Sequence, residues 1–569
     1  NEFLINQENK QQLKKLLKKL YNLKIFDPAC GSGNFLIISY KELCKLELQI
    51  FKQLKKLDKN EWLILKSAIN LNQFYGIEID NYAHELSKVS LYIAQHQVNL
   101  LFKENFGETK PSLPLKTIDN ICNDNALRID WDKFCKRDHK QNIYIIGNPP
   151  YLGYRGRNQD QNIDLENIFL DIGQVKRVDY IGCWFKLATD YTYNFSNIKF
   201  AFVSTNSITQ GEQVNFLWPY IINKNLEIFF AHQTFNWSNN AKGNAGVSCV
   251  IIGLRNIENK QKILFNKDNV IKVNNINPYL TDGKNIIVTP RTNTISNFPE
   301  IHTGSSPIDG GNLILENNEA QELFQKYENA SDFIKPYIGG NDFLTGIKRF
   351  CLWIDDNQLN EALKIDEIRN RIDRCKIWRN KSGRDAKKYA DSPHRFVYRK
   401  YQIGDCLILP MTTSERREYF PVGYQKSGTV VSNGVFTIYN PKIYIFAALS
   451  SKMHMLWLKT IGGRMREDLR YSGQLVYNTF PFNISDIKIT DKLENLALEL
   501  IDAREKYADK TISELYDPNK MPKSILQCHL NIDDVFESTY KTNGFKSDEE
   551  KIEYLFNLYV KSLGDIILL

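Results

Sequence analysis

Short apolar strands alternate with amphipathic helices along the first 255 residues of this 569-residue chain. Such alternation builds a parallel sheet, because each helix carries the chain back to the edge where the next strand begins. The fold class predicted for this part is therefore α/β, with a doubly wound, Rossmann-like sheet whose first five strands have the order 3-2-1-4-5. We expect strands at 24–27, 74–79, 117–122, 143–146, 199–204, 226–231 and 247–254, and helices at 7–21, from about 34, and at 81–98, 180–195 and 212–222.

Glycine and acidic residues follow the first three of these strands. The loop 27–35 contains two glycines, Glu78 stands at the end of the second strand, and Asp124 follows the third. Glycines let the backbone pass close to a ligand, and a carboxylate at such a strand end can accept hydrogen bonds from both ribose hydroxyls. Because no Gly-Lys-Ser/Thr sequence follows the loop, we expect a nucleoside without a phosphate tail rather than ATP or NAD. Asp80 is expected to cap the helix that follows it.

The sequence Asn148-Pro149-Pro150-Tyr151 comes directly after the fourth strand. Strands one and four flank the switch point of a 3-2-1-4-5 sheet, so this loop should face the glycine loop across a crevice. The two prolines offer carbonyl oxygens but no N–H groups, and Asn148 adds a side-chain oxygen. Such acceptors suit an amino group conjugated to a ring, because hydrogen bonds to both of its protons localise the lone pair on nitrogen. Tyr151 supplies a face on which the ring can stack.

Taken in this order, the motifs resemble those of the S-adenosylmethionine-dependent adenine-N6 DNA methyltransferases, whose cofactor motifs precede a catalytic Asn-Pro-Pro-Tyr. The resemblance implies that S-adenosylmethionine is the cofactor, with Glu78 on its ribose, Ile79 against its adenine and Asp124 accepting from its amino group. It also implies that Asn148 and Pro149 hold a target adenine flipped out of double-stranded DNA. The cofactor-binding residues implied in this way are Asp27, Pro28, Ala29, Gly31, Gly33, Phe35, Glu78, Ile79, Asp124 and Asn125.

A flipped base needs a second stacking partner. The segment 234–241, just before the strand expected at 247–254, resembles the aromatic loop that the same family carries at this place. We choose Phe235 over Trp237 for the stacking role, with an ordinary core aromatic as the alternative. The predicted catalytic set is Asn148, Pro149, Pro150, Tyr151 and Phe235.

Basic residues are concentrated in the second half, although the whole chain carries a net charge of only +8. The segment 369–400 holds 12 Lys and Arg against three acidic residues, interleaved with Trp and Tyr, which suits phosphate anchoring. The glycine turn at 462–463 precedes arginines and acids that can pair with G and C in the major groove. A solvated face and a surface salt-bridge cluster are the alternatives. The predicted DNA-binding residues are Arg349, Arg379, Arg384, Lys387, Lys388, Arg416, Arg464, Arg466, Glu467, Asp468 and Arg470.

Several sequence segments of the second half resemble those of the MmeI-like restriction–modification enzymes. In these enzymes one polypeptide carries the nuclease, the methyltransferase and the target-recognition domain. These segments are 333–339, 349–353, 414–417, 470–472 with 477–481, and 515–518 with 521–522.

The sequence changes after 304–311 to Tyr-, Trp- and Arg-rich strands, and beyond about 485 it is helical by periodicity. With the resemblance, these bounds give a methyltransferase domain (1–300), an α+β target-recognition domain (301–485) and a C-terminal helical segment (486–569). The resemblance also implies a nuclease and a helical spacer upstream of Asn1; the absence of methionine before Met411 independently predicts that the chain is a fragment.

Some classes of site and protein are not expected. The ten cysteines form no C-x-x-C pair, so we expect reduced thiols and no metal site. No apolar run is long enough to span a bilayer and no signal peptide is present, so we expect no membrane partner and a cytoplasmic, prokaryotic protein associated with the nucleoid through DNA. Two alternative functions stay open: a DNA sequence-recognition module without independent activity, and a PglX-type phage-defence methyltransferase.

Overall fold

The structure is a computed structural model that describes residues 2–58, 67–107, 118–170, 172, 177–237, 247–267, 269–296, 298–465, 468–482, 484 and 486–564. The chain forms two compact units, Asn1–Ile287 and Val288–Leu568. The first contains the glycine loop and the Asn-Pro-Pro-Tyr sequence, and the second contains the basic segments.

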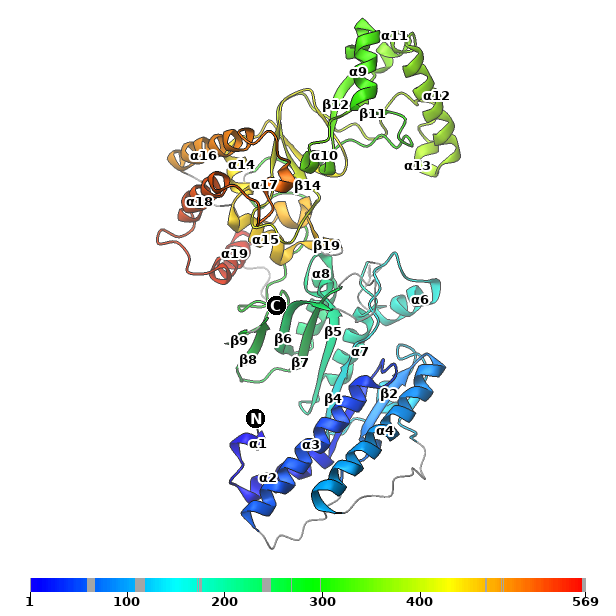
Figure 1. Ribbon diagram of the computed structural model, residues 1–569, viewed down its shortest axis with the longest axis vertical. Helices are drawn as coiled ribbons and strands as arrows, with labels where there is room; N and C mark the ends of the chain where they lie inside the picture. The colour runs from blue at the N-terminus through cyan, green and yellow to red at the C-terminus, as the bar shows by residue number, and fades with distance from the viewer. Residues whose placement is uncertain are drawn as a thin grey trace. The chain divides into compact units, whose positions relative to one another are not determined.

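The first unit is built on one mixed sheet, in which the described strands have the order β3-β2-β1-β4-β5-β7-β6-β8-β9 (Figure 1). All neighbours from β3 to β5 are parallel, whereas β7 runs antiparallel to both β5 and β6. The predicted order of the first five strands and the α/β fold class are thus confirmed. The strands are β1 (Leu23–Asp27), β2 (Phe74–Glu78), β3 (Ile121–Asn123), β4 (Asn142–Gly147), β5 (Ile198–Thr205), β6 (Leu226–Trp237), β7 (Val247–Asn256), β8 (Lys262–Asn266) and β9 (Asn269–Val273).

Amphipathic helices cover this sheet. The apolar faces of α2, α3 and α4 form a core with β1, β2 and β3, in which Leu13, Leu36 and Leu91 are fully buried. Two of these helices, α3 and α4, lie side by side (Figure 1). The helices are α1 (Glu2–Ile5), α2 (Lys10–Tyr21), α3 (Asn34–Leu57), α4 (Asn81–Phe106), α5 (Trp131–Phe134), α6 (Gln159–Ile168), α7 (Gly182–Thr192) and α8 (Glu212–Asn223), with 3-10 turns η1 (Leu71–Gln73) and η2 (Asn206–Thr209).

The second unit combines small sheets with helices. Its described strands form sheets of order β10-β18-β14-β16, β11-β13-β12-β17 and β15-β20-β19. The strands are β10 (His302–Thr303), β11 (Ile314–Glu316), β12 (Ile334–Ile338), β13 (Arg349–Leu352), β14 (Cys406–Pro410), β15 (Thr412–Thr413), β16 (Gly423–Gln425), β17 (Val430–Val431), β18 (Val435–Tyr439), β19 (Gly463–Met465) and β20 (Asp468–Arg470).

Helices form the rest of the second unit, and the C-terminal region is helical as predicted. Two buried histidines bind the end of α14: His454 lies 3.0 Å from the Leu449 carbonyl, and His529 lies 3.0 Å from the Ser450 carbonyl. The helices are α9 (Asn317–Lys326), α10 (Gly340–Thr345), α11 (Leu359–Ala362), α12 (Asp366–Lys381), α13 (Arg384–Lys387), α14 (Tyr444–Leu449), α15 (Lys452–Ile461), α16 (Ile487–Glu505), α17 (Ile512–Leu515), α18 (Lys523–Ser538) and α19 (Asp548–Ser562), with short turns η3 (Glu328–Asp332), η4 (Asp356–Gln358) and η5 (Gly473–Tyr477).

Two kinds of feature are absent from the described residues. No helix among them combines the length and apolar character that a bilayer crossing requires. Nor does the described part of the chain bring three or more His, Cys, Asp or Glu side chains together in a way that could hold a metal ion.

Candidate active site

Two glycines shape the loop between β1 and α3. Gly31 and Gly33 have φ angles of +53° and +84°, in the left-handed region that favours glycine. A Cβ atom on Gly33 would lie 3.2 Å from the Cβ of Ser87 on α4. The backbone amide of Gly31 donates a 2.8 Å hydrogen bond to the carboxylate of Glu78 at the end of β2. The glycine loop is therefore fixed to the neighbouring strand.

Glu78 is held by backbone amides at both of its oxygens. One oxygen accepts from Gly31, and the other accepts from the amide of Asp80 at 2.9 Å. A carboxylate offers about four lone-pair positions, so Glu78 can still accept from two further donors, such as a pair of hydroxyls. Asp80 accepts from the amide of Ala83 at 2.8 Å and caps α4, which confirms the cap predicted from the sequence.

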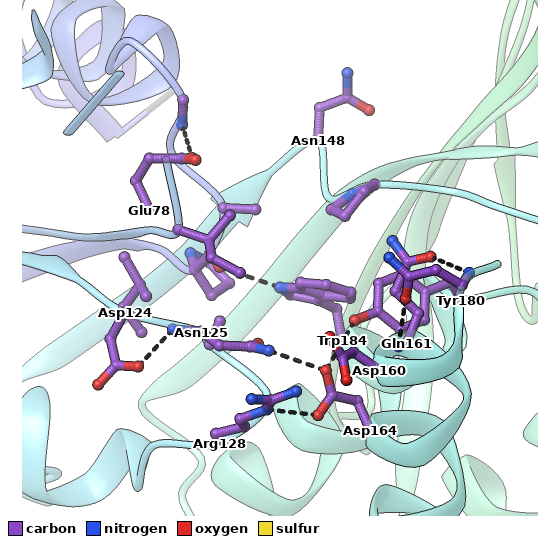
Figure 2. A pocket seen from close by; sticks show the side chains of 18 residues that line it. Glu78, Asp124, Asn125, Arg128, Asn148, Asp160, Gln161, Asp164, Tyr180 and Trp184 are labelled. Carbon is purple, nitrogen blue, oxygen red and sulfur yellow. Dashed lines mark hydrogen bonds and ion pairs between the residues drawn. The ribbon is translucent and has the colours of Figure 1, made fainter. Parts of the chain in front are cut away.

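A cavity of about 740 Å³ lies at the carboxyl ends of β1, β2, β3 and β4 (Figure 2). This volume is within the range of small-molecule sites. The predicted site residues that line it are Pro28, Ala29, Gly31, Glu78, Ile79, Asp124, Asn125, Asn148 and Pro150. The predicted residues outside the lining are Asp27, Gly33, Phe35, Pro149, Tyr151 and Phe235. The structure thus brings the strand ends of the sheet and the Asn-Pro-Pro-Tyr loop to one cavity.

Helices α6 and α7 contribute residues to this cavity that were not predicted from the sequence. Asp164 on α6 is buried and accepts hydrogen bonds from Asn125 at 2.9 Å and from Arg128 at 2.7 Å (Figure 2). The indole of Trp184 on α7 donates to the carbonyl of Pro28 at 3.1 Å. The lining residues that were not predicted are Ile77, Ala126, Arg128, Asn158, Asp160, Gln161, Asp164, Tyr180 and Trp184. One sequence signal could have indicated α6: Asn158 and Gln161 form its capping box at the point where the chain returns to the cavity.

Asn148 carries an unpartnered polar atom. Its Oδ1 is buried and has no hydrogen-bond partner among the described residues, although the side chain lines the cavity. A buried acceptor without a donor is unfavourable unless a ligand or water completes it. The atom is therefore suited to receive a donor such as an amino group.

The aromatic residues predicted to hold a base are linked through Cys249 on β7. Burial raises the pKa of Tyr151, and the neighbouring Cys249 thiol adds to this shift, whereas the Asn148 side chain opposes it. Phe235 on β6 is the cross-strand partner of Cys249, so both side chains point to the same face of the sheet. The ring of Phe235 lies 6.3 Å, centroid to centroid, from the ring of Trp237. The structure therefore places Tyr151, Cys249 and Phe235 in one cluster.

Asp27 lies fully buried between the two loops. Its Oδ1 accepts from the amide of Ala29 at 3.1 Å, whereas its Oδ2 has no hydrogen-bond partner among the described residues. Burial raises the pKa of Asp27 to about 7; the bond from Ala29 opposes this shift and the charge of Glu78 adds to it. A Cβ atom on Gly147 would lie only 2.6 Å from Asp27 Oδ1, so the residue before Asn148 has to be small. The glycine loop and the Asn-Pro-Pro-Tyr loop meet at this carboxyl group.

Known proteins similar to this chain match it along nearly its full length. The family models of MmeI match in order: the DNA-methyltransferase domain over residues 4–266, the target recognition domain over 282–484 and the C-terminal domain over 485–567. The solved structure of the type IIL restriction-modification enzyme MmeI in complex with DNA is 35% identical, with a TM-score of 0.88 over 99% of this chain and 76% of that chain. The chain belongs to the MmeI family. The resemblance found in the sequence is thereby confirmed.

Curated relatives of this MmeI-family chain include two prokaryotic proteins. DNA methyltransferase A of Bacillus subtilis (strain 168) is 40% identical over 560 residues, which are 98% of this chain and 63% of that protein. The chain therefore spans less than two thirds of this relative. A putative type II restriction enzyme and methyltransferase of Methanocaldococcus jannaschii is 43% identical over 89 residues, which are 15% of this chain and 7% of that protein.

One of the DNA-binding residues predicted for this MmeI-family chain, Arg379, lies in the interior of the protein. Arg379 on α12 is 0% exposed, and its guanidinium donates five hydrogen bonds of 2.7–3.0 Å to backbone carbonyls. A guanidinium has five N–H donors, so none remains for a phosphate, and the prediction for Arg379 is wrong. The acceptors are the carbonyls of Pro307, Ile308, Tyr389, Ser392 and Arg395.

The other predicted DNA-binding residues differ in exposure. Arg349 is paired with buried Asp342, and Arg464, whose side chain is 8% exposed, is paired with Glu415. Arg416 is exposed and lies 4.0 Å from Asp517. The remaining exposed members are Arg384, Lys387, Lys388, Asp468 and Arg470, whereas Arg466 and Glu467 lie outside the described residues.

Proposed function

We propose that this chain is a site-specific, adenine-N6 DNA methyltransferase that uses S-adenosylmethionine and flips its target adenine out of double-stranded DNA. One observation carries the proposal: the unpartnered Oδ1 of Asn148 and the partly occupied carboxylate of Glu78 belong to residues that line the same cavity. The family membership gives methyltransferase chemistry, and these two groups suit an adenine amino group and a ribose.

The residues at the strand ends fit the proposed cofactor. Glu78 would accept from the ribose hydroxyls, and Asp124 and Asn125 would lie near the adenine. Ile79 lines the cavity although it is 69% exposed, which suits a side chain that a flat ring covers on binding. When bound, S-adenosylmethionine supplies an electrophilic methyl group on a sulfonium. Six predicted cofactor-binding residues remain. Phe35 lies on α3, and the other five shape the loop beside the cofactor: Asp27, Pro28, Ala29, Gly31 and Gly33.

The Asn-Pro-Pro-Tyr loop would prepare the adenine. The Oδ1 of Asn148 and the carbonyl of Pro149 would each accept a hydrogen bond from one N–H of the amino group, which localises the nitrogen lone pair. Pro150 keeps the loop rigid, and Tyr151 with Phe235 sandwiches the extruded ring. The nitrogen would attack the methyl carbon in line, so that an N–C bond forms as the S–C bond breaks and S-adenosylhomocysteine leaves. The methylated amino group would then give up one proton, and no covalent intermediate with the protein is required.

The further expectations belong to the same proposal. We assign the methyltransferase to 1–300, target recognition to 301–485 and the helical segment to 486–569, in a cytoplasmic protein that associates with nucleoid DNA. The upstream nuclease and helical spacer stay predictions, which sequencing the gene upstream of the codon for Asn1 would test. The match to the MmeI target recognition domain favours this assignment over a PglX-type enzyme.

Replacing Asn148 with alanine tests the mechanism. We expect the methylation rate to fall at least 100-fold, because the variant loses a hydrogen bond that strengthens as charge develops. The substrate is genomic DNA that lacks N6-methyladenine, and the readout is N6-methyladenine after hydrolysis to nucleosides. Asn105→Ala, at an exposed position near the end of α4, is the matched control and should keep wild-type activity. Wild-type transfer by a folded Asn148→Ala protein would contradict the mechanism.

Calorimetry separates the enzyme from an inactive recognition module. Titration of S-adenosylmethionine into the wild type and into Asn148→Ala should give similar affinities, because Asn148 acts on the target base. An absence of binding to the wild type would favour the module.

A further inference from the structure

The turn that follows Tyr151 presents an aromatic ring and a guanidinium to solvent. Tyr154 is 51% exposed and Arg155 is exposed as well. The Nε of Arg155 donates to the Tyr154 hydroxyl at 2.8 Å, and the guanidinium lies 5.4 Å from the centroid of the Tyr154 ring. A hydrogen bond of 2.9 Å from the Gly156 amide to the Gly153 carbonyl closes the turn. The two side chains thus form a preordered pair at the tip.

Both ends of this turn are fixed to the body of the first unit. The amide of Leu152 donates to the half-buried carboxylate of Asp179 at 2.9 Å, and the carbonyl of Leu152 accepts from the amide of Tyr180 at 3.1 Å. At the other end, Arg157 donates to Asn162 Oδ1 at 3.0 Å and also to the carbonyl of Val178. An exposed tip on a fixed base can enter a ligand without large reorganisation.

The turn also borders the candidate active site. Pro150, before it, and Asn158, after it, both line the cavity. The position that a Cβ on Gly153 would take has no heavy atom within 4 Å apart from its chain neighbours, so there is open space beside the first residue of the turn. Tyr154 and Arg155 therefore stand on the exposed turn between two residues of the cavity lining, six and seven residues after Asn148.

We propose that Tyr154, with Arg155 beside it, enters the double helix at the place that the target adenine leaves. Extruding a base breaks its pairing and stacking, and an aromatic ring in the gap restores stacking with the neighbouring bases. The guanidinium adds charge next to the phosphates and stays planar against the stack. Tyr154 is a positioning residue here, since it acts on the flipping equilibrium and not on the methyl transfer. The inference rests on the proposed function.

A substrate comparison tests this role. The recognition site is first mapped by sequencing modified DNA from cells that express the protein. Two 30-base-pair duplexes are then made, one with the target adenine opposite thymine and one with it opposite an abasic site, which removes the pairing energy. Single-turnover methylation is measured for the wild type, Tyr154→Ala, Tyr154→Phe and Arg155→Ala.

We expect Tyr154→Ala to lose about 10- to 100-fold in rate on the paired duplex, and to stay within about threefold of the wild type on the abasic duplex. Tyr154→Phe keeps the ring and should resemble the wild type on both, and Arg155→Ala should show a smaller loss with the same rescue. With 2-aminopurine as the target base, Tyr154→Ala should also give a smaller fluorescence increase.

Equal losses on both duplexes, or no loss on the paired one, would overturn the inference while leaving the proposed function in place. If the wild type methylates neither duplex, the proposed function fails, and the inference fails with it.

Discussion

Asp27 in the first unit and Arg379 in the second are both charged residues with no exposed surface, yet their surroundings differ. Arg379 has all five donors satisfied by carbonyls of its own chain. Asp27 has one oxygen without a described partner, and burial raises its pKa to about 7. A saturated buried charge stabilises the fold, whereas an incompletely satisfied one beside a cavity indicates a place for a ligand.

The largest predicted effect concerns Arg379. Arg379→Ala should lower the free energy of unfolding by about 3–5 kcal/mol, because the five carbonyls that it holds would lose their donors inside the protein. Urea denaturation measures the change. The matched control, Arg384→Ala on the neighbouring helix α13, removes an exposed guanidinium and should change stability by less than about 0.5 kcal/mol. A stable Arg379→Ala variant with weakened DNA binding would contradict the structural role and support a phosphate contact by Arg379.

Buried His454 provides a second test of whether a fully hydrogen-bonded buried side chain stabilises the fold. His454 bonds the Leu449 carbonyl and the Tyr471 hydroxyl, and burial lowers its pKa to about 3. Because the unfolded chain takes up this proton near pH 6.5 and the folded chain does not, the stability that neutral His454 contributes is lost as the pH falls from about 6.5 towards 3.

The measurement compares the wild type with His454→Gln. The destabilisation caused by the substitution should be largest above pH 7 and should shrink by about 2 kcal/mol at pH 5. Asp533, whose pKa is raised to about 7 by burial, shifts stability in the opposite direction in both proteins and cancels in the difference. A destabilisation that does not change with pH would show that the histidine is not held neutral.

The smallest predicted effect concerns the ionisation of Asp27. Its carboxyl group loses its proton as the pH rises through about 7, and the resulting charge attracts a sulfonium. The affinity for S-adenosylmethionine should therefore rise about three- to tenfold from pH 6 to pH 8. S-adenosylhomocysteine, which lacks the sulfonium charge, should show a weaker rise, and Asp27→Asn should show none. Calorimetry that found the same slope for both ligands would separate Asp27 from the cofactor.

The parallel sheet could be predicted because its strands are nearly continuous apolar runs with helices between them. Phe74–Glu78, for example, was expected at 74–79. The residues that follow these strands could be expected to lie together, because the carboxyl ends of parallel strands meet at one edge of the sheet. The contributions of Asp164 and Trp184 could not be predicted in this way, because they reach the cavity from helices whose packing depends on tertiary contacts.

The DNA-binding role predicted for Arg379 was wrong because it rested on the charge of its neighbours and not on its position along the helix. Its neighbours in sequence are basic, which suggested a surface contact, but its spacing from Ile368, Ile372 and Cys375 puts it on the buried face of α12. This helical spacing is visible in the sequence and would have indicated an interior position. Charge density alone did not separate a structural arginine from one that faces solvent.

The antiparallel strand β7 has a consequence for how the first unit folds. β6 and β7 pair from Trp237 with Val247 outward, between residues that are near neighbours in sequence. In contrast, β1 pairs with β4 across a long intervening stretch of the same unit, as in the pair Leu23 and Asn142. Local pairings close small loops and form fast, while distant parallel pairings form slowly. The ribbon that carries Phe235 and Cys249 can therefore assemble early, and the pairing that brings the glycine loop beside the Asn-Pro-Pro-Tyr loop completes last.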